Sequence, residues 1–172
     1  MSRLRRIAIS DRFFFITTNL QRGVAPLSPS ERDICLYELG RTRTKHGFAL
    51  FAYAVMPDHV HILIRCLEAV MPRLMRDWKS VSGFAIAQAR GRKAGIWQPR
   101  YFDFILRRAS DFGKKFAYIH DNPVAAGLVA HAEDWPWSSA AFYIKKATVP
   151  VTPDVYQVPL DPNEPLWPVP WK

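Results

Sequence analysis

The chain has 172 residues, which is enough for one domain with a substantial core, and 49% of them are apolar, as in a globular protein. Two cysteines without a CxxC motif exclude a disulfide scaffold and a cysteine zinc site, and the absence of an 18-residue apolar run or signal-peptide pattern predicts a soluble, cytoplasmic protein. The 24 Lys and Arg against 15 Asp and Glu give a formal net charge of +9, which favours a polyanionic partner, nucleic acid before membrane.

The first two elements have clear local signals. Residues 13–19 (FFFITTN) are aromatic and β-branched, which is typical of a strand. Ser28, Pro29 and Glu31 then form a capping box with a proline in the first turn, which predicts the start of a helix. Gly47 offers the left-handed position at which this helix ends.

The remaining elements follow in short succession. They are strands at 48–55 and 59–66, a helix from Pro72 to about residue 86, a strand over 96–107 and a helix over 111–121. Pro123 should end this last helix, which places Asn122 at or just past its end. The order β-α-β-β-α-β-α predicts an α+β, ferredoxin-like fold: a four-stranded antiparallel sheet with one additional C-terminal helix.

We expect one domain over residues 1–143 and a Pro-rich, irregular tail over 144–172. Prolines restrict the free chain, and the tail tryptophans Trp167 and Trp171 gain from burial, so we expect the tail to dock on its own domain or on a second copy. A disordered extension is the alternative.

The stretch from residue 59 to residue 65 is the first place to look for chemistry. At a period of two its aliphatic residues point to one face, and His59, His61 and Arg65 point to the other. Two imidazoles at i and i+2 on one strand face can share a cation. The alternative is a pair of half-exposed surface histidines.

The last predicted helix supplies a second group. Tyr118 and Asn122 are four residues apart and lie on one helix face. Spacing alone favours an ordinary core tyrosine at position 118, and a capping or turn residue is the alternative for Asn122. The functional interpretation requires that both meet the two histidines.

Four motifs in order resemble a known family. Residues 56–64 (MPDHVHILI) resemble the HUH signature of the single-tyrosine transposases. The later motifs resemble those of the REP-associated tyrosine transposases, and they are residues 97–103 (WQPRYFD), 118–124 (YIHDNPV) and 134–139 (DWPWSS). Two positions depart from the pattern: Asp58 replaces the usual Asn, and Ala125-Ala126 replaces a polar pair. The resemblance covers roughly residues 10–143.

The resemblance implies a mechanism as well as a fold. It implies that His59, His61 and Asn122 hold one divalent metal ion, Mg²⁺ or Mn²⁺, and that Tyr118 on the additional helix attacks single-stranded DNA to leave a 5′-phosphotyrosine and a free 3′-OH. A phenol in water has a pKa near ~10, so the nucleophile needs help in losing its proton, and His120 is a candidate for proton transfer or orientation.

The expected partner is single-stranded or hairpin DNA, bound by a monomer or a homodimer, with no membrane partner. The candidate DNA-binding residues are Arg73, Arg76, Lys79, Arg92, Lys93 and Arg100. For each of them a solvated surface charge is the alternative. Two other functions remain open: a catalytically silent ferredoxin-like module that binds single-stranded nucleic acid, and, with less support because no acidic cluster accompanies the histidines, an HxH metallohydrolase.

Overall fold

The structure is a computed structural model that describes residues 11–93 and 95–166. Its elements are β1 (Asp11–Asn19), α1 (Pro29–His46), β2 (Ala49–Val55), β3 (His59–Leu67), α2 (Met71–Ala89), β4 (Phe102–Leu106), α3 (Ala109–Ala125), the 3₁₀ turn η1 (Ala132–Asp134) and α4 (Ala140–Lys145). The four strands form one antiparallel sheet in the order β2-β3-β1-β4. This is the predicted ferredoxin-like α+β arrangement with an additional C-terminal helix, and the prediction is confirmed.

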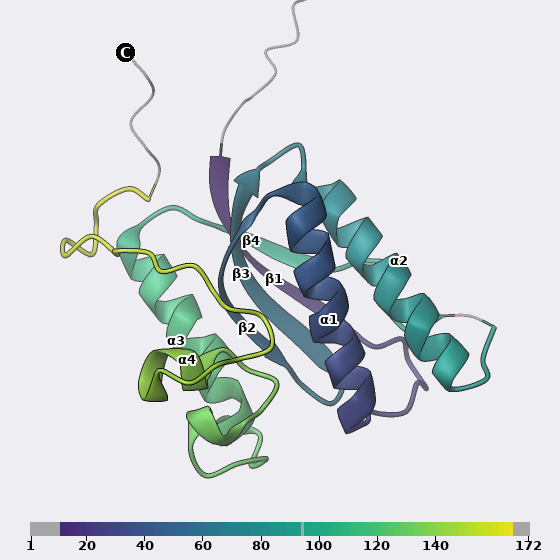
Figure 1. Cartoon of the computed structure of the whole chain (residues 1–172). Helices are drawn as coiled ribbons and strands as arrows, with labels where there is room; N and C mark the ends of the chain where they lie inside the picture. The colour runs from purple at the N-terminus through teal and green to yellow at the C-terminus, as the bar shows by residue number, and fades with distance from the viewer. Residues whose placement is uncertain (1–10, 94, 167–172) are drawn as a thin grey trace, which may run out of the picture.

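Helices cover both faces of the sheet. Figure 1 shows α1 and α2 side by side on one face, and α3 and α4 on the other. Because β1 alternates between the faces, Phe14 and Ile16 enter the core under α1 and α2, whereas Phe13 and Phe15 enter a second core under α3. The sheet is therefore the common wall of two apolar layers.

The first helix begins and ends where the sequence predicts. The Ser28 hydroxyl accepts from the backbone N–H of Glu31, and the Glu31 carboxylate accepts from the backbone N–H of Ser28 at 2.7 Å. Gly47 ends the helix with φ +66°, a left-handed conformation that residues with a Cβ atom rarely adopt.

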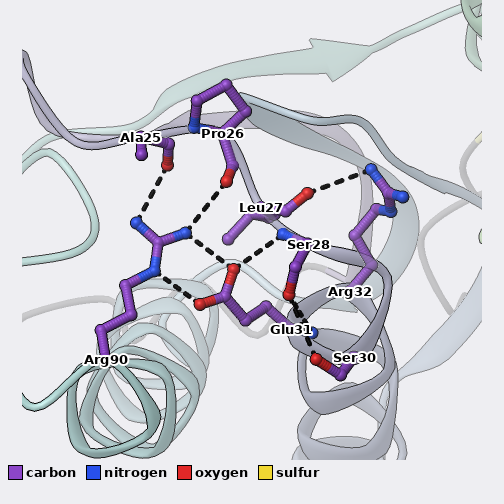
Figure 2. Close-up of polar contacts among 8 residues, drawn as sticks. All are labelled: Ala25, Pro26, Leu27, Ser28, Ser30, Glu31, Arg32 and Arg90. Atoms are coloured by element: carbon purple, nitrogen blue, oxygen red, sulfur yellow. Dashed lines mark hydrogen bonds and ion pairs between the residues drawn. The ribbon is translucent and has the colours of Figure 1, made fainter.

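An ion pair ties this capping box to α2. Arg90 forms two bonds with the Glu31 carboxylate, one of 2.7 Å from its Nη2, and donates to the carbonyls of Ala25 and Pro26 (Figure 2). Both partners are largely buried, and the Arg90 guanidinium holds the pKa of Glu31 below its usual range against the opposing effect of burial. Through this contact both helices hold the loop that precedes α1.

Two expected boundaries are wrong. The fourth strand begins at Phe102 rather than at residue 96. Residues 96–101 form an isolated bridge between Trp97 and Leu20 rather than a continuous ladder, and regular pairing with β1 starts only at Phe102. The last helix runs past Pro123 to Ala125. The proline removes only its own N–H, and the following turn is closed by a 3.0 Å bond from the Leu128 N–H to the Pro123 carbonyl.

The tail docks on its own domain over the part that the structure describes. The Asp154 N–H donates to the Leu50 carbonyl and its carboxylate accepts from the Leu50 N–H, so the tail covers part of the free edge of β2. Val151 is buried in the core under α1 and α2. This confirms the docking prediction for residues up to 166, whereas Trp167 and Trp171 lie outside the described residues. None of the helices described is both long enough and apolar enough to span a bilayer.

Candidate active site

The two histidines lie where β3 begins, on the sheet face that carries α3. The centres of the His59 and His61 rings are 4.6 Å apart, and the rings stand at 71° to each other. The intervening Val60 points to the opposite core, as the period of two predicts. His61 is buried, and desolvation lowers its pKa to about 3, so the imidazole is neutral in the folded protein near pH 7.

Each histidine is oriented through its Nδ1 atom. The Asp58 carboxylate lies 2.6 Å from Nδ1 of His59, and the Thr17 hydroxyl lies 2.8 Å from Nδ1 of His61. A carboxylate can only accept, so Nδ1 of His59 donates to Asp58 and Nε2 is the ring nitrogen left to bind a ligand. Nε2 of His61 is buried and has no hydrogen-bond partner among the described residues. A buried unpaired ring nitrogen is costly, and a ligand would satisfy it.

These atoms fit a divalent metal ion. Two imidazoles, each oriented by an oxygen on Nδ1, are a common donor pair for such ions. Among the described residues no three His, Cys, Asp or Glu side chains are arranged so that they could hold a metal ion, so a third protein ligand would be of another type. Asn122 is of that other type. It is half-buried inside α3, one turn beyond Tyr118 and on the same helix face, rather than at the helix end as predicted.

Tyr118 lies directly beside the histidine pair. Its ring centre is 5.2 Å from that of His61 and 5.8 Å from that of Phe15, and 48% of the residue is exposed. The Nζ atom of Lys115, one turn earlier on α3, lies 5.6 Å from the Tyr118 ring centre. The structure therefore places an exposed tyrosine beside the buried histidine.

His120 occupies a different position from Tyr118. It is buried on another side of α3, where its Nε2 pairs with the Ser139 hydroxyl at 2.7 Å and its ring packs on Phe116 and Tyr143. Ser139 in turn bonds to the backbone of β2, and burial lowers the pKa of His120 to about 4. Of its two expected roles, this geometry favours orientation of α3 over proton transfer at Tyr118.

The predicted DNA-binding residues lie on and next to α2, across the sheet from Tyr118. Four of them line a pocket of about 840 Å³ between α2 and the segment that leads to β4, namely Arg76, Lys79, Arg92 and Lys93. Arg73 and Arg100 are exposed beside it. The apolar part of the wall includes Phe84, Trp97 and Tyr101.

Lys79 differs from the other basic residues of this group. Its ammonium donates to the carbonyls of Gln98 at 2.6 Å and Pro99 at 2.9 Å, and desolvation lowers its pKa. These contacts hold the pocket wall in place. The hydrogen bonds of Lys79 therefore give it a structural role in the pocket wall before any role in DNA binding.

Three residues that orient or flank the site were not among the predicted site residues. Thr17 faces His61 only because of the register between β1 and β3, which no local sequence signal reveals. Asp58 is adjacent to His59 in the sequence, and its departure from the family pattern was the available signal. Lys115 could have been found from its i−3 spacing to Tyr118.

Comparison with known proteins places this fold among the DNA transposases. The family model described as "Transposase IS200 like" matches residues 30–122, more than half of the chain, and the chain belongs to that family. This result confirms the resemblance seen in the four sequence motifs.

Individual relatives agree with this assignment. The chain is 27% identical over 151 residues to the REP-associated tyrosine transposase of Escherichia coli K12, which covers 88% of this chain and 90% of that protein. A Haemophilus influenzae relative is 27% identical over 150 residues, with 81% and 85% covered. A solved structure of a REP-associated tyrosine transposase bound to a REP hairpin superimposes with a TM-score of 0.68 at 26% identity, over 95% of this chain and 98% of that one.

Proposed function

We propose that this transposase is a metal-dependent nuclease and strand transferase that cuts single-stranded DNA beside a REP-like hairpin through a 5′-phosphotyrosine at Tyr118. The observation that carries the proposal is the contact between the exposed Tyr118 ring and buried His61, whose Nε2 has no partner among the described residues. The solved relative bound to a REP hairpin supports the substrate class.

His59 and His61, with Asn122 as the third protein ligand, would hold the divalent ion. When bound, this ion supplies Lewis-acid stabilisation of the charge that develops on the phosphate oxygens. Either Mg²⁺ or Mn²⁺ could be the ion, and imidazole nitrogens are better ligands for Mn²⁺ than for Mg²⁺. Asp58 and Thr17 engage the Nδ1 atoms and so keep the Nε2 atom of each histidine oriented toward the ion.

Tyr118 is the nucleophile in this proposal. Its phenolic oxygen loses a proton to solvent and attacks the phosphorus, and the bond from phosphorus to the 3′ oxygen breaks. The 3′ oxygen leaves as a hydroxyl after it takes up a proton, and the downstream strand stays attached to Tyr118 through its 5′ phosphate. Because one phosphodiester replaces another, the 3′-OH of the same or another strand can attack the phosphotyrosine and restore a DNA bond without a nucleotide cofactor.

The hairpin would lie along the pocket beside α2. Gln98 on the pocket wall donates to the carbonyl of Asn19, and Asn19 pairs with His59 across β1 and β3. The pocket and the histidine pair therefore border the same end of the sheet. A hairpin held by Arg76, Arg92 and Lys93 could thus extend a single strand toward Tyr118.

The test is adduct formation with a labelled hairpin oligonucleotide that carries single-stranded flanks. The proposal predicts a denaturation-resistant protein–DNA adduct and a free 3′-OH fragment when Mg²⁺ or Mn²⁺ is present, and neither product when a chelator removes the metal. Tight binding without adduct under any metal would instead indicate the silent nucleic-acid-binding module.

A further inference from the structure

Two phenylalanines next to the site have no role in the mechanism above. Phe102 and Phe104 belong to β4, the outermost strand on the β1 side of the sheet. In the β1–β4 register Phe104 lies opposite Phe15, and Phe102 lies opposite Thr17. Both therefore project from the sheet face that carries His61 and Tyr118. They are also exposed, Phe102 by 55% and Phe104 by 42%.

These rings and the nucleophile form one surface, which we call the aromatic platform: Phe15, Phe102, Phe104 and Tyr118. The centre of Phe15 lies 6.4 Å from that of Phe102 and 5.8 Å from that of Tyr118. Lys115 projects over it, with its Nζ 4.5 Å from the centre of Phe15 and 5.6 Å from that of Phe104. Phe15 is the buried base of the platform, and the other three rings are exposed. Three exposed rings around a cation are a feature that a merely structural strand does not need.

We propose that Phe102 and Phe104 stack unpaired bases next to the scissile phosphate, while the Lys115 ammonium attracts the DNA backbone. Residues two apart on a strand are separated by about 6.8 Å, which gives each of two successive bases its own ring. Exposed rings beside a cation are the arrangement that proteins use to bind single-stranded nucleic acid without reading its sequence. The inference rests on the proposed function, since it assigns the substrate's single-stranded part to this surface.

The charge around the platform supports DNA over an apolar protein partner. Exposed Arg107 and Arg108 follow β4 directly, and exposed Lys114 precedes Lys115 on α3. The acidic residue of the strand, Asp103, lies opposite Ile16 and so projects from the other face of the sheet. Asp111 lines a small pocket together with Phe104 and Arg107 and accepts from the backbone N–H groups of Arg107 and Arg108. A phosphate backbone would therefore meet more cations than carboxylates at the platform.

The experiment measures DNA binding in a Tyr118→Phe background, so that no covalent step interferes. Fluorescence anisotropy at fixed salt would compare Phe102→Leu and Phe104→Leu, which stay apolar but lose the ring, with Phe102→Trp, which restores it. Tyr37→Leu is the matched control, because Tyr37 is 66% exposed on α1, on the opposite face. The probes are a flanked hairpin oligonucleotide and a series in which one abasic site moves through the flanks.

Each Phe→Leu change should weaken binding of the intact oligonucleotide by about 5- to 100-fold, the range expected for loss of one stacked base. The abasic site at the matching position should remove that loss, Phe102→Trp should bind as tightly as the parent, and Tyr37→Leu should bind unchanged. If the leucine variants bind like the parent, or if their loss is the same on every abasic oligonucleotide, the platform does not stack bases.

The adduct assay separates this inference from the proposed function. If the unsubstituted protein forms the adduct while Phe102→Leu and Phe104→Leu bind normally, the platform is overturned and the role of Tyr118 stands. If binding shows the matched loss but no adduct ever forms, the platform stands and the proposed chemistry is overturned.

Discussion

The two faces of the sheet differ in the hydrogen bonding and the exposure of their aromatic side chains. One face lies under α1 and α2, and the other lies under α3. On the first face, the indole N–H of Trp78 donates to the Cys35 carbonyl and that of Trp97 donates to the Ser82 hydroxyl. On the α3 face, the Nε2 atom of His61 has no partner among the described residues, and Tyr118 stands half in solvent.

Helices cover both faces of the sheet, so this difference between the faces indicates which of them carries the function. Satisfying a buried polar group stabilises a fold, so a face that leaves one unpaired next to exposed rings carries a cost that stability does not explain. Two comparable atoms lie on the side of α1 and α2: Thr18 Oγ1 and Arg32 Nε are also buried without a partner among the described residues. The Arg32 guanidinium is nevertheless held by a bond from its Nη1 to the Leu27 carbonyl and by its position over the Trp137 ring. Thr18 follows Thr17 directly on β1 but faces the other side of the sheet, so the two threonines allow a direct comparison of the faces.

The largest effect should come from removing one oxygen on the α3 face. Tyr118→Phe should abolish the DNA adduct, because it removes the nucleophile, while DNA binding and the melting temperature stay nearly unchanged because the side chain is half-exposed. Tyr37→Phe, the same change on an exposed tyrosine of α1, is the control and should form adduct normally. Gel analysis after denaturation measures both. Normal adduct formation by Tyr118→Phe would mean that another residue is the nucleophile.

On the other face the largest effect should be on stability. Glu31→Gln leaves Arg90 without its carboxylate and should lower the free energy of unfolding by about 3 kcal/mol at pH 7, measured by urea denaturation. The pKa of Glu31 is lowered in the folded protein, so its contribution is present above the unfolded value of ~4.3 and is lost as the pH falls through the folded value. The difference in the free energy of unfolding between the unsubstituted protein and Glu31→Gln should therefore become smaller below about pH 4. A gap that is constant with pH would show that the carboxylate charge is not the cause.

The sheet offers a sharper comparison in two adjacent threonines of β1. Thr17→Val removes the hydroxyl that orients His61 and should weaken metal binding roughly 10-fold, as measured by Mn²⁺ titration. Thr18→Val makes the same change on the other face, where the hydroxyl is unpaired among the described residues, and should leave metal binding unchanged and stability equal or higher. Equal effects of the two changes on metal binding would remove the distinction between the faces.

The smallest effect concerns the basic pocket. Arg76→Gln should lower the slope of log affinity for DNA against log salt by about 1, because one phosphate contact and its counterion are lost. Lys79→Gln should change that slope less, since its ammonium is engaged by backbone carbonyls, and should lower the melting temperature instead. Salt titrations of the two variants decide this, and a larger slope change for Lys79→Gln would reverse the assignment.

Local signals in the sequence were sufficient for much of the fold and for part of the site. The capping box at Ser28 and the left-handed Gly47 set the ends of α1 through contacts within four residues, and the period of two placed His59 and His61 on one face. The end of α3 was missed, because bonds formed after Pro123 close a turn that proline usually prevents.

The parts that the sequence did not predict depend on contacts between distant segments. Thr17 reaches His61 across 44 positions, and Lys79 reaches the carbonyls of a segment about 20 residues away. The exposure of Phe102 and Phe104 depends on β4 being the edge strand, which is a property of sheet order. Such contacts follow from register and topology rather than from any local pattern.

The most direct test of the account is to find the residue that carries the DNA. The full chain would react with a flanked hairpin oligonucleotide and Mn²⁺, the adduct would be digested with protease and nuclease, and mass spectrometry would locate the remaining nucleotide. The account predicts a 5′-phosphonucleotide on the phenolic oxygen of Tyr118. A nucleotide on any other residue, or a cut strand with no residue modified, would contradict it.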